Sequence, residues 1–180
     1  MKKPVYHIVF AALCGLCLAG LLTIWALERN GIYLWLAGVA TPGLRHNLCI
    51  ALTLLVFAWL MTLLWKWVPS KVAKIFLCVV AAVLLAAAFY LQMLGFALEH
   101  GGEKYSVYTS PDGTHTVVVM DDSDFHSVHG DVYQMTSAVT MRRIGNWSGE
   151  YGDAYTVTWD GAHVVLEING RKRYFCIWMG

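Results

Sequence analysis

Three uninterrupted apolar segments constrain this chain more than any other feature. Val5–Leu27, Leu48–Trp65 and Ile75–Leu98 each run for about 18 residues or more without a charged side chain. A helix of that length rises by about 1.5 Å per residue and covers the roughly 30 Å hydrocarbon core of a bilayer. The chain is 58% hydrophobic and 14% charged, which excludes an ordinary soluble domain and a disordered chain. The segments therefore predict three transmembrane helices.

The charges divide the chain into two unlike parts. Residues 1–98 hold seven Lys or Arg and one acid, Glu28, whereas residues 99–180 hold six basic residues and eleven acids. We expect a transmembrane domain over residues 1–98 and a small polar domain over residues 103–180. The first apolar segment exceeds the 7–15 residues of a signal-peptide core, so we interpret it as a retained helix.

Basic residues also predict the orientation. Five of them flank the chain start and the second connection, namely Lys2, Lys3, Lys66, Lys71 and Lys74. The first connection, residues 28–47, holds two, Arg29 and Arg45. Because basic residues favour the cytoplasmic side, the N-terminus is predicted to be cytoplasmic. After three spans, the C-terminal domain then lies outside the cytoplasm.

The first connection raises the question of a fourth span. Gly31–Leu44 is apolar but has only 14 residues and contains Thr41-Pro42-Gly43, so it is too short to cross a bilayer. We expect an interfacial or re-entrant segment with Tyr33 and Trp35 at the level of the headgroups.

Small residues recur at helical spacing on two of the predicted spans. Ala11, Gly15 and Ala19 fall on one face of the first helix, and Ala82 and Ala86 fall on one face of the third. Such seams let helix backbones approach closely in lipid. Two interpretations stay open, namely packing within a three-helix bundle and docking of a second protein. A polar residue in the third span, Gln92, predicts a hydrogen bond between helices rather than a transport pathway.

The sequence of the second domain predicts antiparallel β-structure. Residues 105–109 alternate in polarity, Ser110-Pro111-Asp112-Gly113 forms a turn, and residues 114–120 return. Further strands are predicted at 130–135, 139–144, 154–159, 162–168 and 171–178, with Asp160-Gly161 and Asn169-Gly170 as hairpin turns and 146–153 as a loop. We therefore expect a membrane α plus β fold: three transmembrane helices followed by an antiparallel β-meander of six or seven strands.

Several of these turns carry a resemblance. Residues 108–113, Gly130-Asp131-Val132-Tyr133, Trp159 and Ile168-Asn169-Gly170 follow one another in the order of a "ysPngky…v.G.v…W.d…v.ING" pattern. This pattern resembles the small extracytoplasmic β-domain of uncharacterised membrane-anchored proteins of Gram-positive bacteria. The resemblance covers about residues 105–172 and implies an external, bacterial β-domain without any transferable activity.

A polar cluster at residues 121–131 is the first candidate for chemistry. His126 and His129 could bind a metal through imidazole nitrogens, and Asp124 or Asp131 could add oxygen ligands. The spacing matches no closed zinc motif and no EF-hand loop. A solvated turn is the alternative, and no cofactor is predicted.

Cys14 and Cys17 form a C-x-x-C pair inside the first apolar segment. Thiol chemistry requires the thiolate, which burial in an apolar environment disfavours. Membrane packing is therefore the main interpretation of this pair, and intramembrane thiol redox chemistry is the alternative.

The basic run Arg171-Lys172-Arg173 is a candidate binding surface or a charged edge strand that resists aggregation. The sequence contains no Gly-x-Ser-x-Gly elbow and no phosphate-binding glycine loop. We therefore predict a non-enzymatic membrane protein whose external domain serves protein interaction, as an accessory, immunity or sensor subunit. The expected partners are the lipid bilayer and a membrane protein or a second copy, and nucleic acid is not expected. Metal-dependent or ligand-binding activity at His126 and His129 is the alternative.

Overall fold

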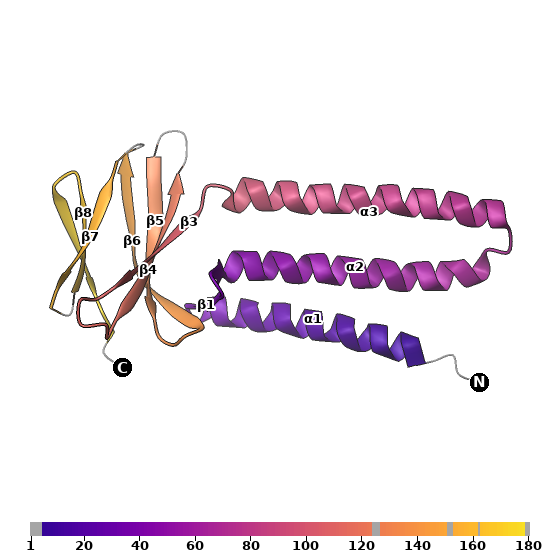
Figure 1. Cartoon of the computed structure of the whole chain (residues 1–180), viewed down its shortest axis with the longest axis horizontal. Coiled ribbons are helices and arrows are strands. Elements are labelled where there is room, and N and C mark those ends of the chain that lie inside the picture. Colours follow the sequence, from indigo (N-terminus) through magenta and orange to yellow (C-terminus); the bar gives the residue numbers. More distant parts are fainter. Residues whose placement is uncertain (1–4, 124–126, 151–152, 162, 179–180) are drawn as a thin grey trace. The chain divides into compact units, whose positions relative to one another are not determined.

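The computed structural model describes residues 5–123, 127–150, 153–161 and 163–178. It contains three helices that are long and apolar enough to cross a membrane, α1 (Val5–Arg29), α2 (Thr41–Trp67) and α3 (Lys71–His100). Seven of the nine strands of the described chain, all in antiparallel sheets, follow them in sequence (Figure 1). The predicted layout of three apolar helices and an antiparallel β-domain is thus confirmed.

The chain folds as two compact units. One comprises Met1–Ala26 with Thr41–Leu98, and the other comprises Leu27–Ala40 with Glu99–Gly180. The sequence boundary at residue 98 separates most of the two units, but it assigned Leu27–Ala40 to the membrane part. We call the two parts the helical unit and the β unit.

Gly31–Leu44, for which the sequence predicts an interfacial or re-entrant segment, has regular secondary structure, and its position at a membrane surface stays a prediction. It forms β1 (Ile32–Leu36) and β2 (Val39–Ala40), and Thr41–Leu44 then begin α2. Ala37 and Gly38 have positive φ angles of 51° and 83°, which suit the two-residue turn of a hairpin. Pro42 lies in the first turn of α2, where a missing N–H costs nothing. The segment is therefore a strand pair followed by a helix start.

Few side chains of the helices are buried by this chain. The buried residues are Cys14 and Ile24 in α1, Thr41 in α2 and Ala81 in α3. Polar contacts join the helices: the Trp59 Nε1–H donates to His7 Nδ1 at 2.8 Å, and Gln92 Nε2–H donates to Thr53 Oγ1 at 2.6 Å. The predicted interhelical hydrogen bond of Gln92 is confirmed.

The β unit contains two antiparallel sheets. The first has six strands in the order β2-β1-β6-β5-β4-β3, with β3 (Lys104–Thr109), β4 (Thr116–Ser123), β5 (Ser127–Met135) and β6 (Thr140–Glu150). The second has the order β7-β8-β9, with β7 (Tyr155–Asp160), β8 (His163–Ile168) and β9 (Arg171–Cys176). Within each run of β3–β6 and β7–β9, neighbours in sequence are neighbours in the sheet, as a meander requires (Figure 1).

The main core lies between the two sheets. Val117, Val119, Val132 and Trp147 of the large sheet belong to one buried cluster with residues of the small sheet, namely Val164, Leu166, Ile168 and Phe175. Tyr155, Val157 and Trp159 of β7 pack against this cluster, whereas Thr156 and Thr158 are exposed. The one-sided character predicted for this strand is confirmed.

The opposite face of the six-stranded sheet carries a second, smaller cluster. It consists of Ala40, Val118, Tyr133 and Met141, with Tyr33 and Trp35 of β1 packed against it. The ring of Tyr33 meets that of Tyr133 edge-on, with centroids 5.0 Å apart. Tyr33 and Trp35 therefore serve the packing of the β unit.

β6 is longer than the sequence predicted. The stretch 146–153, expected as a loop because it holds two glycines, continues the strand to Glu150. Trp147 is buried and anchors the stretch to the core. At Gly145, a Cβ would lie 2.4 Å from the Phe175 ring, so this glycine is needed for close packing rather than for a turn.

Candidate functional site

The basic run on β9 is divided by the alternation of the strand. Arg173 faces Leu166 and Arg171 faces Ile168 across the β8–β9 pair, so both point to the inner face of the small sheet. Lys172 faces Glu167 instead, on the other face, and its Nζ lies 3.8 Å from the Glu167 carboxylate. Tertiary structure thus assigns two of the three basic residues to one surface and the third to another.

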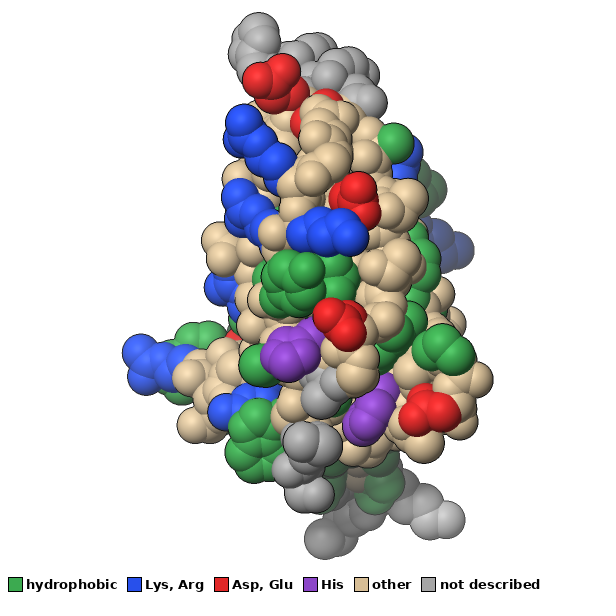
Figure 2. All heavy atoms as spheres, turned by 90° about the vertical axis from the view of Figure 1, so that its left-hand side faces the viewer, with side chains coloured by type: hydrophobic (Ala, Val, Ile, Leu, Met, Phe, Trp, Pro, Cys, Tyr) green, Lys and Arg blue, Asp and Glu red, His purple; other side chains and the backbone are tan. Residues whose placement is uncertain are grey.

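Arg171 and Arg173 line a polar groove of about 350 Å³. The rest of its lining comes from the end of β6, the connection to β7 and the β8–β9 turn, namely Ser148, Gly149, Glu150, Asp153, Ile168 and Asn169. We call the groove that these residues line the β6–β9 groove. On the end of the β unit that Figure 2 faces, Lys and Arg side chains gather along one side.

Asp153 fixes the shape of the groove. Its Oδ2 accepts the backbone N–H of Glu150 at 2.7 Å, and its Oδ1 accepts the side-chain amide of Asn169 at 2.6 Å. A Cβ at Gly149 would lie 3.0 Å from Asp153 Oδ2, so only a small residue lets the carboxylate come this close. Asp153 thereby joins the end of β6 to the β8–β9 turn.

The two arginines of the groove have no carboxylate partner among the described residues. Neither guanidinium forms an ion pair with an Asp or Glu of the described residues, although Glu150 and Asp153 line the same groove. The Asp153 carboxylate is engaged through both oxygens by the loop hydrogen bonds. The groove therefore offers two guanidinium groups and one carboxylate, that of Glu150, to a ligand.

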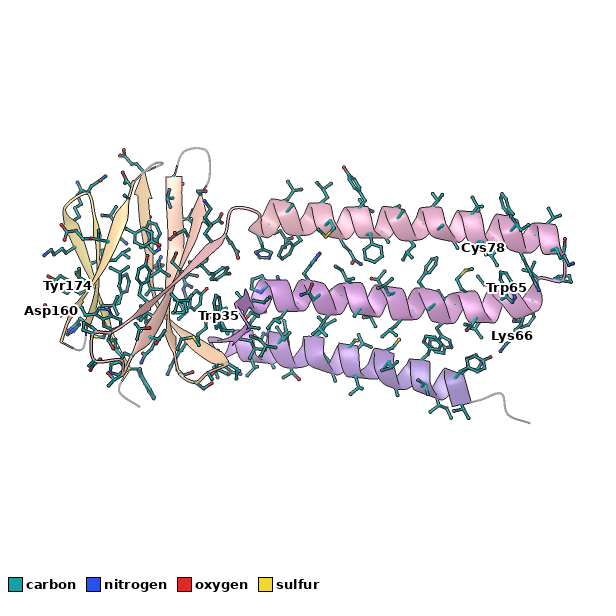
Figure 3. The ribbon with its side chains drawn as sticks, viewed as in Figure 1. Trp35, Trp65, Lys66, Cys78, Asp160 and Tyr174 are labelled. Carbon is teal, nitrogen blue, oxygen red and sulfur yellow. The ribbon has the colours of Figure 1, made fainter. Side chains whose placement is uncertain are left out.

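Exposed aromatic side chains lie beyond the groove on β9 and the residues after it. Tyr174 is 57% exposed and Trp178 is 61% exposed, and Tyr174 lies on the small sheet, as labelled in Figure 3. The Arg142 guanidinium lies 4.9 Å from the Trp178 ring centroid, in cation–π range. Phe175 and Ile177 are buried in the core. The inner face of β9 thus carries Arg171, Arg173 and the buried Phe175, whereas the outer face carries Lys172 and the exposed Tyr174.

The predicted metal cluster is only partly described. Asp124 and His126 lie outside the described residues. His129 Nε2 lies 3.5 Å from Asp122 Oδ2, and Asp131 Oδ1 lies 2.6 Å from the Arg143 guanidinium. In the described ranges, no group of three His, Cys, Asp or Glu residues could hold a metal ion. His129 and Asp131 lie on one face of β5, but each has a different charged partner.

A second, shallower groove of about 300 Å³ surrounds these residues. Met120, His129, Asp131, Arg143 and Asn146 line it, over Gly130 and Trp147. Burial and the neighbouring Asp131 carboxylate raise the pKa of Tyr133, whose hydroxyl donates to Asp131 Oδ2 at 3.2 Å. Because Asp131 is already bound by Arg143 and Tyr133, this groove offers a ligand fewer free charged groups than the β6–β9 groove does.

The turn that carries the sequence resemblance is held by side-chain hydrogen bonds. Ser110 Oγ donates to Asp112 Oδ1 at 2.5 Å and accepts the His115 backbone N–H at 2.9 Å. The bonds from Ser110 and Thr114 lower the pKa of Asp112 to about 2. These polar groups serve the turn itself.

The cysteines of the described chain are free thiols. Cys14 is buried and Cys17 is partly buried on α1, and Cys176 is exposed on β9. Cys14 and Cys17 form no disulfide with each other. Thiol redox chemistry at this pair stays a prediction.

The small-residue seams do not pack inside this chain. Ala11, Gly15 and Ala19 are exposed on α1, and Ala82 and Ala86 are exposed on α3. A Cβ built on Gly15 would meet no atom within 4 Å. Of the two interpretations that the sequence left open, the structure does not use the seams for packing among α1, α2 and α3.

Comparisons with protein-family models, with curated proteins and with solved structures found no match for this chain. Function must therefore be argued from the chain's own residues. The sequence indicated Arg171, Lys172 and Arg173 but not Glu150, Asp153 or Asn169. The alternation of residues 171–178 could have separated the arginines from Lys172. The sequence predicts a loop at 146–153, where β6 forms the opposing wall of the groove.

Proposed function

We propose that this chain is a non-enzymatic, multi-pass membrane protein that presents its β unit outside the cytoplasm for protein interaction. In this role it is an accessory, immunity or sensor subunit of a membrane complex. The observation that carries the proposal is the uncovered seam of Ala11, Gly15 and Ala19 on a membrane helix. Small exposed residues give a second transmembrane helix a surface for close backbone packing.

The pairing of β1 with β6 supports three spans rather than four. β1 follows α1, and β6 follows α3, yet the two strands pair from Ile32 with Arg142 to Leu34 with Thr140. Two spans, α2 and α3, separate them in sequence, so both strands emerge on the same side of a bilayer. A fourth span inside residues 31–44 would separate these strands by the membrane.

The basic residues support an external β unit. Lys66 lies in the last turn of α2, and Lys71 and Lys74 lie in the first turn of α3. Figure 3 labels Trp65 and Lys66 at this end of α2. Lys74 Nζ lies 5.0 Å from the Trp65 ring centroid, and Lys66 Nζ lies 4.4 Å from that of Tyr6. Aromatic and basic side chains at a helix end are typical of a membrane–water interface. The positive-inside rule then orients the α2–α3 connection toward the cytoplasm.

Cys176 allows a direct test of orientation, because it is an exposed free thiol of the β unit. Intact cells expressing the full chain are treated with a membrane-impermeant maleimide. We expect labelling that Cys176→Ser abolishes. Labelling only after the cells are permeabilised would place the β unit in the cytoplasm and overturn the proposed topology.

The seam itself is tested by substitution in the native membrane. The full-length protein is extracted in mild detergent, and the mass and composition of its complex are measured. Joint replacement of Ala11, Gly15 and Ala19 by Leu should release the partner, because the larger side chains block close approach. Ala12→Leu, an exposed position on α1 beside the seam, is the matched control. A complex that survives the triple substitution would exclude the seam as the interface.

A further inference from the structure

Two strand edges of the β unit have no strand partner along the β6–β9 groove. β9 is the terminal strand of the three-stranded sheet. β6 pairs with β1 only through Thr140, Met141 and Arg142, so its later residues face no strand of the described chain on that side. Ser148, Gly149 and Glu150 of β6 line the groove together with Arg171 and Arg173 of β9. On the β9 side, the groove is therefore bordered by peptide groups that an added strand could satisfy, whereas the Glu150 N–H of β6 already donates to Asp153.

The β8–β9 turn indicates which peptide groups face outward. Asn169 and Gly170 both have positive φ angles, 50° and 75°, as a type I′ two-residue hairpin requires. The closing pair of such a hairpin, here Ile168 with Arg171, exchanges both of its hydrogen bonds. Alternate residues, Lys172 and Tyr174, then direct their N–H and C=O groups to the free edge. The same edge thus combines available backbone groups with arginine side chains that point into the groove.

The far end of this edge is already occupied by a side chain that acts as a strand partner. Gln134 Oε1 accepts the backbone N–H of Trp178 at 2.7 Å, and Gln134 Nε2–H donates to the Trp178 carbonyl at 2.8 Å. The buried Gln134 amide thus satisfies both backbone groups of Trp178, which follows the core residues Phe175 and Ile177. The part of β9 without such a partner is the part beside the arginines.

We propose that the β6–β9 groove receives an extended acidic segment of a partner protein, which adds as a strand to the free edge of β9. The backbone groups of Lys172 and Tyr174 bind the peptide backbone of that segment. Arg171 and Arg173 bind carboxylates at alternate positions of it, since neither guanidinium has an acidic partner in the described chain. Strand addition of this kind takes its affinity from main-chain hydrogen bonds and its specificity from alternate side chains.

A protein segment is the occupant that the geometry favours. A sugar polymer or an inorganic polyanion could satisfy the guanidinium groups, but it has no alternating backbone donors and acceptors for the edge of β9. The proposal rests on the proposed interaction function and names the surface and the partner chemistry. It differs from the membrane seam, because the two surfaces lie on different units.

The test uses full-length protein in detergent micelles and a fluorescein-labelled peptide, Thr-Glu-Val-Glu-Thr-Glu-Val, followed by fluorescence anisotropy. We expect saturable binding that falls about tenfold in the Arg171→Ala/Arg173→Ala variant, as the loss of two exposed ion pairs implies. Lys104→Ala is the control, because it removes an exposed positive charge of the same unit on β3, outside the groove. Its binding should change less than twofold.

A second peptide separates backbone addition from simple charge attraction. The same sequence with N-methyl groups on alternate residues keeps every carboxylate but loses the donors that would pair with β9. We expect it to bind at least tenfold more weakly. Equal binding of both peptides, or of inorganic polyphosphate and the unmodified peptide, would overturn strand addition.

The remaining outcomes are also decisive. Absence of saturable binding up to millimolar peptide would overturn the proposal. Light scattering that shows a dimer, dissociated by the double arginine variant, would assign the groove to a second copy and overturn the partner segment. A native complex that is lost in the seam variant but kept in the arginine variant would leave the proposed function intact and refute this inference alone. Absence of any native complex would instead count against the proposed function.

Discussion

The helical unit and the β unit differ in how far their apolar side chains are buried by the chain itself. Within the helical unit only a few residues are buried by the chain, and Trp67 of α2 is 82% exposed. In the β unit, Val117, Val118, Val119 and Trp147 are at most 1% exposed. Apolar contacts within the chain therefore specify the β unit. The helices need lipid or another protein to cover their surface, because their apolar surface is not removed from water by the fold itself.

The largest test of this contrast compares two tryptophans. Trp147 packs against Tyr155 with ring centroids 5.0 Å apart, and its Nε1–H donates to the Met120 carbonyl at 3.3 Å. Trp147→Ala should lower the free energy of unfolding of the β unit by about 3–5 kcal/mol. Near-UV circular dichroism of the full chain in detergent during thermal unfolding measures this loss.

Trp67→Ala is the control for that measurement. Because its side chain is exposed, the change in unfolding free energy should stay within about 0.5 kcal/mol. Equal effects of the two substitutions would show that the core of the β unit does not dominate its stability.

Two glycines provide the next test. At Gly130, a Cβ would lie 1.8 Å from the Met120 carbonyl oxygen and 2.7 Å from Trp147 Nε1. Gly130→Ala must therefore displace β4 backbone or Trp147, and we expect a loss of about 1–3 kcal/mol. Gly15→Ala on α1 meets no atom and should leave the thermal transition of the β unit unchanged. A tolerated Gly130→Ala would mean that the sheet can relax around the added methyl group.

The smallest expected effect concerns a carboxylate at the margin of the core. Tyr155 donates its hydroxyl hydrogen to Asp121 Oδ2 at 2.9 Å, while Asp121 Oδ1 is buried without a partner in the described chain. Burial raises the pKa of Asp121, and the Tyr155 bond offsets part of that rise. The folded state then holds this proton more tightly than the unfolded state. This contribution to stability is present below the unfolded pKa of about 3.9 and is lost as the pH rises through the folded pKa.

Asp121→Asn keeps an acceptor for Tyr155 and removes this titration. We expect the variant to gain stability relative to the wild type as the pH rises above about 4, and denaturant unfolding across pH 3–8 measures the difference. Asp160→Asn, an exposed substitution on β7, should show no comparable trend. A stability difference that does not vary with pH would contradict the ionisation penalty at Asp121.

Local patterns predicted the parts of the fold that depend on neighbouring residues. Long apolar runs predicted α1, α2 and α3, and Asn169-Gly170 predicted the β8–β9 hairpin, because hydropathy and positive φ preferences act within a few residues. The sequence predicted Asp160 as the first residue of the turn between β7 and β8. In the structure Asp160 is instead the last residue of β7 and pairs with His163. Helix starts were less visible, as α2 begins at Thr41 rather than near Leu48.

The candidate site was predictable only in part. The basic run was visible because three adjacent charges stand out in the sequence. Glu150, Asp153 and Asn169, which complete the groove, carry no comparable signal. Gly149 and Gly152 predicted a loop, whereas Gly149 lies on β6 and admits the Asp153 carboxylate.

The sequence by itself determined that this chain has three apolar helices and an antiparallel β-domain, since both follow from local polarity and turn chemistry. Only the tertiary structure decided that β1 pairs with β6, more than a hundred residues later in sequence, and that Arg171 and Arg173 face β6 while Lys172 faces away. Strand partners are selected by the packing of distant side chains such as Tyr33 on Tyr133. No local pattern contains that information, because the contact exists only after both strands have found the same sheet.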